Sequence, residues 1–533
     1  MHSPSRAAAH LPGWAAPLGA AATAASLRTW LLARGSVPFN SDEAVVALMA
    51  RHILQGQRPV FFYGQAYLGS LDAWLVAGAF RLAGESVVAV RIVQLILYLS
   101  FIMIFWRLAL DVFANPLPAG VAVWLLAIPA VYVVTYTTAS LGGYGELMVL
   151  GVLVLWLANR IANGTWHSNW SVWAVLGLCS GVGFWVSGLF VVFALPAAVI
   201  ILLKLRPIRV GFLSLAGTAF LIGSSPWWVY NLQHGWAALA AFTGEQYGNS
   251  TLWMRLTGLL LVGLPALAGI RFPWQAELAP PLLTVWGSLL FIGPLIFLGV
   301  EIKRKLRNSG GLNIGTGALL ITTLVFVFLV IFLFSRFGVD ATGRYLLPLC
   351  IPVTLLLAWT IAAATRQHTA WGIALLLSAL FFQAVQTGRA ALSQDGLTTQ
   401  FDPITRFDNR HDAELIAFLT ERGESRGYSH YWVTFRLAFL SQENLIFAPS
   451  LPYKNNLALS PQDNRLPAYT EAANASPQTA YILTSNPALE DRVVKGLSEL
   501  NVAYQVKVIG PYRVYYRLSQ PVRPWQLGIE VTP

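Results

Sequence analysis

Four ionisable residues of the sequence stand at the edges of long apolar segments, where an uncompensated charge is costly. Asp42 and Glu43 follow the first apolar segment, Glu146 follows a glycine pair, and Arg344 precedes a late apolar segment. A carboxylate beside a hydroxyl can act as a general base or as a metal ligand. A guanidinium can bind a phosphate through two parallel hydrogen bonds and stays charged in an apolar setting. The residue types therefore predict acid–base and phosphate-binding chemistry.

Each of these residues also has a structural interpretation. Asn40 followed three residues later by Glu43 fits a capping box, and acids favour the N-terminus of a helix. The same preference accounts for Glu146. An arginine such as Arg344, followed by Tyr345, often extends to the headgroups from the end of a membrane helix. Local sequence alone leaves both interpretations open at each position.

Further polar residues lie close to these four along the sequence. Asp340 and Arg336 are a candidate ion-pair partner of Arg344 and a second phosphate donor, or plain loop charges. Side chains that suit a sugar, or equally an aromatic belt at the lipid boundary, are Tyr63, Gln65, Tyr345 and His234. A lone histidine gives no evidence of a metal site.

The composition identifies the setting as a membrane. Of 533 residues, 56% are hydrophobic and 11% are charged, whereas soluble domains average about 45–50% and about 25%. The net charge of +11 comes from Lys and Arg between apolar segments, which is typical of cytoplasmic loops and not of a nucleic-acid-binding surface. The sequence contains no phosphate-binding loop, no serine nucleophile elbow and no His-Glu-x-x-His zinc motif.

Stretches of about 20 apolar residues predict membrane-spanning helices. There are about eleven, near residues 12–34, 87–109, 116–138, 145–161, 171–187, 189–205, 208–230, 281–301, 314–335, 345–364 and 370–388. The basic loops fall on one side if the N-terminus is cytoplasmic and residues 252–270 do not cross. Loop 35–86 and the C-terminal part are then extracytoplasmic.

The predicted architecture is a polytopic α-helical membrane domain, residues 1–390, followed by a soluble α/β domain, residues 391–533. Helical periodicity appears in loop 35–86 at residues 42–55 and 67–82 and again at 252–270, where we expect surface helices. In the C-terminal domain we expect a helix over 412–422 and strands over 428–434, 444–448, 479–484, 502–509 and 512–518.

The order of these features resembles the GT-C membrane glycosyltransferases. The stretches that carry the resemblance are SDEAVVALMARHILQGQRPVFFYG at 41–64, GGYGE at 142–146 and GRYLLPL at 343–349. They look like the bacterial glycosyltransferase family 39-like branch, which is similar to protein O-mannosyltransferases and the lipid A aminoarabinose transferase. The resemblance covers about residues 30–390.

The resemblance implies an inverting transfer of a hexosyl or pentosyl group from a polyprenyl-phosphate-linked donor, on the outer face of a bacterial plasma membrane. By position in the motifs, Asp42 matches the general base, Glu43 its acidic neighbour, Glu146 the second acid and Arg344 the phosphate-binding residue. Some relatives use a divalent cation, Mg²⁺ or Mn²⁺, and others do not. Asp42 and Glu146 are the candidate metal ligands, and the absence of an Asp-x-Asp pattern leaves metal dependence open.

The acceptor, which is a lipid, a polysaccharide or a protein, is not encoded in any motif. The C-terminal domain is expected to bind the acceptor or to cover the site. The alternative function is a non-catalytic transporter or flippase of lipid-linked sugars. Transporters place polar or broken helices at the membrane midplane and often contain repeats, whereas here the ionisable residues gather at one face and no repeat is found.

Overall fold

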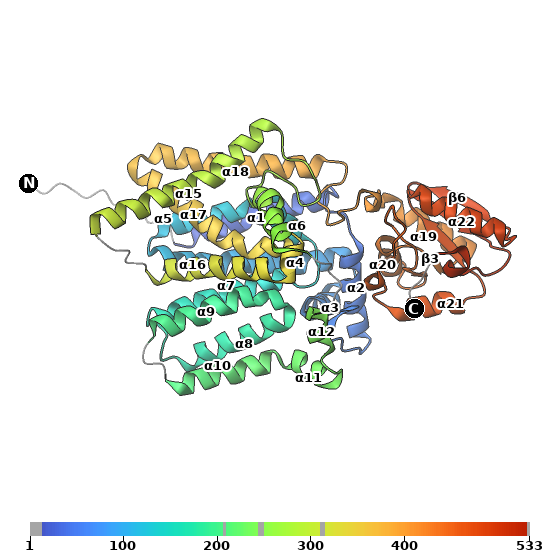
Figure 1. Cartoon of the computed structure of the whole chain (residues 1–533), viewed down its shortest axis with the longest axis horizontal. Coiled ribbons are helices and arrows are strands. Elements are labelled where there is room, and N and C mark those ends of the chain that lie inside the picture. The colour runs from blue at the N-terminus through green and yellow to red at the C-terminus, as the bar shows by residue number, and fades with distance from the viewer. Residues whose placement is uncertain (1–12, 206–208, 244–249, 310–314, 530–533) are drawn as a thin grey trace, which may run out of the picture.

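The computed structural model describes residues 13–205, 209–243, 250–309 and 315–529. The chain forms a bundle of long helices up to residue 392, followed by a smaller domain built around a β-sheet. Figure 1 shows the helices of the bundle side by side, with the C-terminal domain at one end of them, next to α2 and α3. The predicted combination of a helical membrane part and a C-terminal α/β part is confirmed.

A helix occupies each of the eleven ranges predicted to span the membrane. The bundle contains α1 (Ala15–Ala33), α4 (Val87–Phe113), α5 (Pro116–Ala127), α6 (Val131–Thr138), α7 (Tyr144–Ala162), α8 (Trp170–Val186), η1 (Gly188–Phe190), α9 (Val191–Lys204), α10 (Val210–Gly223), α11 (Ser225–Gln233), α15 (Pro281–Ser309), α16 (Thr316–Phe334), η4 (Arg344–Leu349), α17 (Cys350–Gln367) and α18 (Thr369–Leu392). In the described residues, six helices are long and apolar enough to cross a membrane, or up to eight if the bent pairs α5–α6 and α10–α11 each count as one span. A span number of eleven stays a prediction.

The first loop forms its own small structure at one end of the bundle. It contains α2 (Ser41–Leu54), the hairpin strands β1 (Phe61–Phe62) and β2 (Gln65–Gly69), and α3 (Leu71–Ala83). The prediction of one helix over 67–82 is wrong at its start, because Gly64, with φ of +69°, permits the tight turn that pairs Phe62 with Gln65. We call the end of the bundle that carries these elements the loop face.

The second long loop is helical over much of its length. It contains α12 (Ala237–Thr243), α13 (Leu252–Gly258), the π-helical turn η2 (Leu259–Gly263) and α14 (Leu264–Leu267), and η3 (Arg336–Val339) lies in the later loop before η4. The expected helix near 252–270 is therefore present. Its large apolar side chains Trp253 and Leu261 are each 70% exposed, as a helix at a membrane surface requires.

Two helices place Arg160 and Lys204, from two of the predicted basic loops, at the end of the bundle opposite the loop face. α7 begins beside the first loop, where a Cβ on Gly142 would lie 3.4 Å from the Phe62 ring, and ends next to Arg160. The segment that leads into α9 pairs with the first loop through Leu68 and Ser187, and α9 ends at Lys204. The separation agrees with the charge asymmetry expected of a membrane protein.

The C-terminal domain is an α/β domain with a mixed five-stranded sheet. Its elements are α19 (Asp412–Arg422), β3 (Arg426–Tyr428), α20 (Tyr431–Leu440), β4 (Ile446–Ala448), α21 (Pro467–Ala475), β5 (Ala480–Leu483), α22 (Pro487–Glu499), β6 (Gln505–Ile509) and β7 (Tyr512–Tyr516). The strand order is β4-β3-β5-β7-β6, with β3 parallel to β4 and β5, and β7 antiparallel to β5 and β6. The helix predicted at 412–422 and four of the five predicted strands are confirmed.

The strand predicted over 428–434 is wrong, because most of that segment belongs to α20. The helix begins after His430, whose Nδ1 accepts a hydrogen bond from the backbone N–H of Trp432 at 3.2 Å. Aromatic and β-branched residues favour a strand locally. Here, however, Tyr431 and Phe435 pack on α2 while Val433 and Leu437 pack in the domain's own core. A helix buried on two faces is apolar all round, which hides its periodicity.

Candidate active site

Asp42 lies in the first turn of α2, at the loop face. The side-chain oxygen of Asn40 accepts a hydrogen bond from the N–H of Glu43 at 3.0 Å, so the predicted helix cap is present. From Ser41 to Ile53, Asp42 is the one residue that is not buried. The phenol of Tyr431, in the C-terminal domain, donates a hydrogen bond to Oδ1 of Asp42. Asp42 is therefore a partly exposed carboxylate on a helix that is otherwise covered.

Glu43, its neighbour, is completely buried and paired. Its carboxylate is held by the guanidinium of Arg91 in α4, through Nε to Oε1 and Nη2 to Oε2. The backbone N–H of Ser140 also approaches Oε1, at 3.5 Å. Burial raises the pKa of Glu43, and the Arg91 charge and hydrogen bonds oppose that rise. The arrangement positions α2 against α4 and leaves Glu43 turned away from solvent.

Asp72 in α3, which the sequence analysis missed, lies in the same buried region. Its Oδ1 accepts a hydrogen bond from Nε2 of Gln94 at 2.9 Å, and its Oδ2 accepts one from Oγ of Ser140 at 2.6 Å. Burial raises the pKa of Asp72, while hydrogen bonds from Ser140 and from the N–H groups of Gly142 and Gly143 oppose the rise. The available sequence signal was an acid on the apolar side of a predicted amphipathic helix, since the buried residues of α3 are Asp72, Ala73, Val76, Ala77 and Phe80.

Glu146 lies in the first turn of α7 and is 2% exposed. Its carboxyl group interacts with that of Asp72. Among the described residues, no ion pair joins the Glu146 carboxyl group to a basic side chain. Two carboxyl groups in contact repel each other when both are ionised. Asp72 and Glu146 thus form a buried acidic pair at the loop face, and an ionisable residue in a membrane helix is a functional candidate.

Arg344 opens η4, which continues into α17. Its Nε lies 2.6 Å from Oδ2 of Asp340, so the predicted ion pair is confirmed. Oδ1 of Asp340 accepts a hydrogen bond from the N–H of Thr342 at 2.8 Å, and the guanidinium lies 4.9 Å from the centre of the Tyr345 ring. The Arg344 side chain is 36% exposed. It is therefore a positioned cation that remains accessible to an anion.

The segment 140–146 connects the predicted site residues. Ser140 contacts Glu43 and Asp72, and Glu146 contacts Asp72. Tyr144, at the start of α7, interacts electrostatically with Arg344. No hydrogen bond or ion pair among the described residues joins Asp42, Glu146 and Arg344 directly. Glu146 belongs to this segment and Arg344 interacts with its Tyr144, whereas Asp42 is connected to it only through the neighbouring Glu43.

The remaining predicted site residues divide among three places. Gln65, in β2, lies against Arg465 of the C-terminal domain. Tyr63 lies near the other end of α2, where its hydroxyl is 3.0 Å from Nδ1 of His52. His234 follows α11 and stacks on Tyr230 with a centroid distance of 4.1 Å. The side chain of Arg336 lies outside the described residues.

A metal site is not assembled by these residues alone. In the part of the chain that the structure describes, no three His, Cys, Asp or Glu side chains are grouped so that they could hold an ion. Asp42 and Glu146, the candidate ligands, interact with Tyr431 and Asp72 respectively. Metal dependence stays an open expectation.

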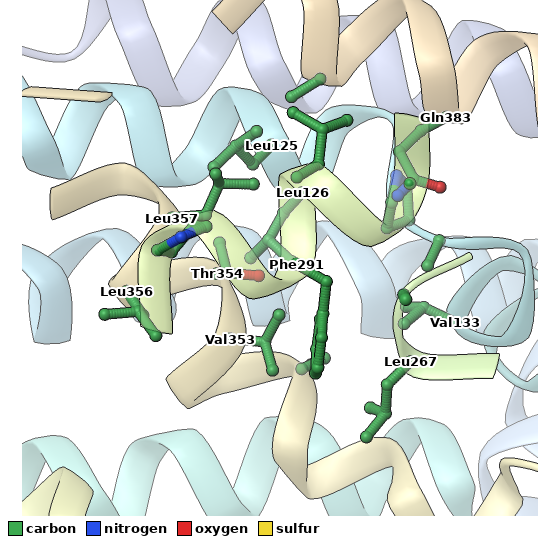
Figure 2. Close-up of a pocket in the computed structure, with 18 of the residues that line it drawn as sticks. Leu125, Leu126, Val133, Leu267, Phe291, Val353, Thr354, Leu356, Leu357 and Gln383 are labelled. Carbon is green, nitrogen blue, oxygen red and sulfur yellow. The ribbon is translucent and has the colours of Figure 1, made fainter. Parts of the chain in front are cut away.

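An apolar cavity of about 110 Å³ lies within the bundle, beside the helix that Arg344 opens. Its walls come from α5, α6, α14, α15, α17 and α18; Figure 2 shows Leu126, Phe291 and Val353 around it, with Gln383 at one side. Val353 and Leu357 belong to α17, the continuation of η4. The cavity therefore offers a hydrocarbon-binding surface along the same helix as the phosphate-binding candidate.

The chain is similar to known proteins in part of its sequence and in its fold. A family model described as dolichyl-phosphate-mannose-protein mannosyltransferase matches residues 70–230. No curated protein matches the chain. The crystal structure of ArnT from Cupriavidus metallidurans bound to undecaprenyl phosphate is similar, with a TM-score of 0.53, 13% identity, and coverage of 93% of this chain and 97% of that chain.

Two further solved structures share the architecture. The apo state of the same ArnT gives a TM-score of 0.53 at 13% identity, covering 93% of this chain and 95% of that chain. The apo oligosaccharyltransferase of Archaeoglobus fulgidus gives a TM-score of 0.50 at 11% identity, covering 89% of this chain and 70% of that chain. The predicted resemblance to the GT-C membrane glycosyltransferases is thereby confirmed at the level of the fold.

Proposed function

We propose that this chain, which has the fold of the GT-C membrane glycosyltransferases, is an inverting glycosyltransferase that moves a hexosyl or pentosyl group from a polyprenyl-phosphate-linked donor to an acceptor hydroxyl. The observation that carries the proposal is the contrast between two adjacent acids. Asp42 is partly exposed with one oxygen held by Tyr431, whereas Glu43 is buried in an ion pair with Arg91. A general base needs an accessible carboxylate oxygen, and of the two acids Asp42 meets this requirement.

Arg344 is the proposed binding site for the donor phosphate. Its guanidinium is accessible and is paired with Asp340. The apolar cavity lies farther along the same helical segment, where α17 forms part of the cavity wall. A phosphate with a hydrocarbon tail has this combination of a charged head and an apolar chain. ArnT, whose fold is similar, has been solved with undecaprenyl phosphate, and this agrees with a polyprenyl phosphate as the carrier.

The proposed reaction is a single displacement. The acceptor oxygen attacks the anomeric carbon and forms the new glycosidic bond, while the bond from that carbon to the phosphate oxygen breaks. Asp42 accepts the acceptor's hydroxyl proton. The polyprenyl phosphate leaves as an anion that needs no proton, and Arg344 stabilises the charge that develops on it. One displacement inverts the anomeric configuration.

The buried acids have supporting roles in this scheme. Glu43 holds the first turn of α2 against α4 and so fixes the position of Asp42. The contact between Asp72 and Glu146 joins α3 to α7. If a divalent cation takes part, Asp42 and Glu146 are the carboxylates we propose as its ligands, since Mg²⁺ and Mn²⁺ prefer oxygen donors.

The proposed location is the plasma membrane of a bacterium, with the N-terminus cytoplasmic and the loop face and C-terminal domain extracytoplasmic. The separation of Arg160 and Lys204 from the loop face supports this orientation. The proposed partners are the bilayer, the lipid-linked donor and an acceptor. The acceptor is a lipid, a polysaccharide or a protein, and the experiment below distinguishes these classes.

The test uses the full chain in liposomes with synthetic polyprenyl-phosphate hexoses and pentoses and an envelope fraction as acceptor source. Mass spectrometry follows released polyprenyl phosphate and the mass gained by the acceptor. Asp42→Asn is expected to lower turnover about 10²–10⁴-fold, and Asp491→Asn, at an exposed position of α22, serves as the matched control. Turnover by Asp42→Asn at the wild-type rate would overturn the assignment. Movement of the donor between leaflets without its consumption would favour a transporter.

A further inference from the structure

The C-terminal domain contacts the first turn of α2 through Tyr431. The backbone carbonyl of Tyr431 accepts a hydrogen bond from Oγ of Ser41 at 2.7 Å, and its phenol donates to Oδ1 of Asp42. Tyr431 is thus hydrogen-bonded to two successive residues of α2, Ser41 and Asp42. Burial, and then the neighbouring Asp42 carboxylate, raise the pKa of Tyr431 well above its usual value. The phenol therefore keeps its proton and acts as a donor to Asp42.

Arg465 is a second group from the C-terminal domain at this place. It is 7% exposed, and its guanidinium lies 5.6 Å from the Phe62 ring centre and 5.4 Å from that of Tyr431. With the Gln65 amide oriented so that its oxygen faces the guanidinium, Nη1 and Nη2 donate to that oxygen at 2.8 and 2.7 Å. Arg465 is thereby fixed between the hairpin of the first loop and α20.

The charge of Arg465 acts on Asp42. Burial alone would lower the pKa of Arg465, but Tyr431 and Asp42 raise it above its ordinary value. The acidic and phenolic groups that interact electrostatically with Arg465 or Asp42 are Asp463, Tyr67, Tyr453 and Tyr431. Arg465 is therefore a buried cation that interacts both with Asp42 and with Tyr431, the residue that donates a hydrogen bond to Asp42.

The domain interface has a different character at the other end of α2. There the carboxylate of Glu443 lies 3.1 Å from Nε2 of His52 and 3.5 Å from Nη1 of Arg51, and it accepts a hydrogen bond from the Tyr469 hydroxyl at 2.7 Å. This cluster docks the domain without contacting Asp42. Mutations can therefore weaken the docking of the C-terminal domain without changing the residues that contact Asp42.

We propose that Tyr431 and Arg465 are positioning residues for the transfer reaction: they orient the Asp42 carboxylate, so that the C-terminal domain completes the active site. The proposal rests on the proposed role of Asp42 as general base. With Tyr431 holding Oδ1, Oδ2 is the oxygen left to accept the proton of the acceptor hydroxyl.

The test measures kcat and the donor KM of the full-length protein in liposomes for Tyr431→Phe, Arg465→Gln and Arg465→Lys. Tyr431→Phe keeps the ring and the contact with Ser41 and removes one hydrogen bond to a charged group. We expect kcat to fall about 10- to 100-fold, with the donor KM changed less than about twofold. Arg465→Lys is expected to recover part of the activity that Arg465→Gln loses, because the lysine restores the charge.

Glu443→Gln is the matched control, because it weakens docking at the far end of α2. It is expected to lower the melting temperature while kcat stays near the wild-type value. If Glu443→Gln lowers kcat as much as Tyr431→Phe does at a similar loss of stability, the effect is one of docking and the proposal is wrong.

A double-mutant cycle separates this inference from the proposed function. If Tyr431 acts through Asp42, the double variant Asp42→Asn/Tyr431→Phe is no slower than Asp42→Asn alone. Additive losses would overturn the positioning role. Full activity of Asp42→Asn would instead overturn the proposed function, and loss of activity in Asp42→Asn with full activity in Tyr431→Phe and Arg465→Gln would overturn only the present inference.

Discussion

The guanidinium of Arg91 in α4 holds both carboxylate oxygens of Glu43 at the start of α2. The two partners are 48 residues apart in sequence, and the Glu43 side chain has no exposed surface. Asp42, the preceding residue, interacts with the C-terminal domain instead. Two adjacent acids therefore have different environments, and this difference can be tested.

Glu43→Gln is expected to destabilise the protein strongly. The change leaves Arg91 buried and without its counter-charge, and breaking a buried ion pair in this way costs about 3–5 kcal/mol. Asp42→Asn removes a partly exposed charge and is expected to leave the melting temperature nearly unchanged while lowering turnover about 10²–10⁴-fold. Thermal unfolding of the two variants in the same detergent provides the comparison. Equal stability of both variants would contradict the different roles assigned to the two acids.

Arg344→Gln is expected to weaken donor binding more than it affects folding. Its guanidinium is the proposed phosphate ligand, so the apparent Kd for a polyprenyl phosphate should rise about 10- to 100-fold, the value of a charge-assisted pair of hydrogen bonds. Arg366→Gln, at the exposed other end of α17, is the control for a lost membrane-surface charge. Fluorescence quenching by a labelled polyprenyl phosphate measures both, and equal losses would remove Arg344 from the site.

Val353→Trp is expected to discriminate among donors by tail length. The tryptophan side chain, which is larger than valine, is expected to fill part of the apolar cavity in Figure 2. A donor with a long tail then loses its binding surface, whereas a short-chain donor does not. The ratio of kcat/KM for long and short donors should fall at least several-fold, since each buried CH₂ contributes about 0.8 kcal/mol. The short donor serves as an internal control for damage to the active site. An unchanged ratio would show that the tail binds elsewhere.

Asp463 gives the expected pH dependence of stability. Burial raises its pKa from 3.8 to about 6, although Arg465 and Lys454 oppose the rise. A group with a raised pKa in the folded state contributes stability that is fully present below pH 3.8 and is lost as the pH rises through about 6. The melting temperature of the wild type minus that of Asp463→Asn should therefore fall between about pH 4 and pH 7. A difference that grows with pH would contradict the burial of this carboxyl group.

The sequence by itself determined the membrane helices, the α/β nature of the C-terminal domain and the grouping of charges at the loop face. Lipid offers no hydrogen-bond partners, so a long apolar stretch in a membrane adopts a helix whatever surrounds it. The cap of Asn40 on Glu43 and the pair of Arg344 with Asp340 are also local, since each joins residues within four positions. Short-range signals of this kind are readable without a fold.

Only the tertiary structure decided which partner each side chain has. Glu43 forms an ion pair with Arg91, and Asp72 contacts Glu146. Asp42 accepts a hydrogen bond from Tyr431, which lies 389 residues away in sequence. The same long-range packing turned the aromatic segment after His430 into a helix, because α20 is buried between α2 and the sheet. Burial and ion pairing depend on segments that the chain brings together only on folding, so local residue types carry no signal for them. Asp42 was therefore predictable as a candidate base, whereas the domain that holds it in place was not.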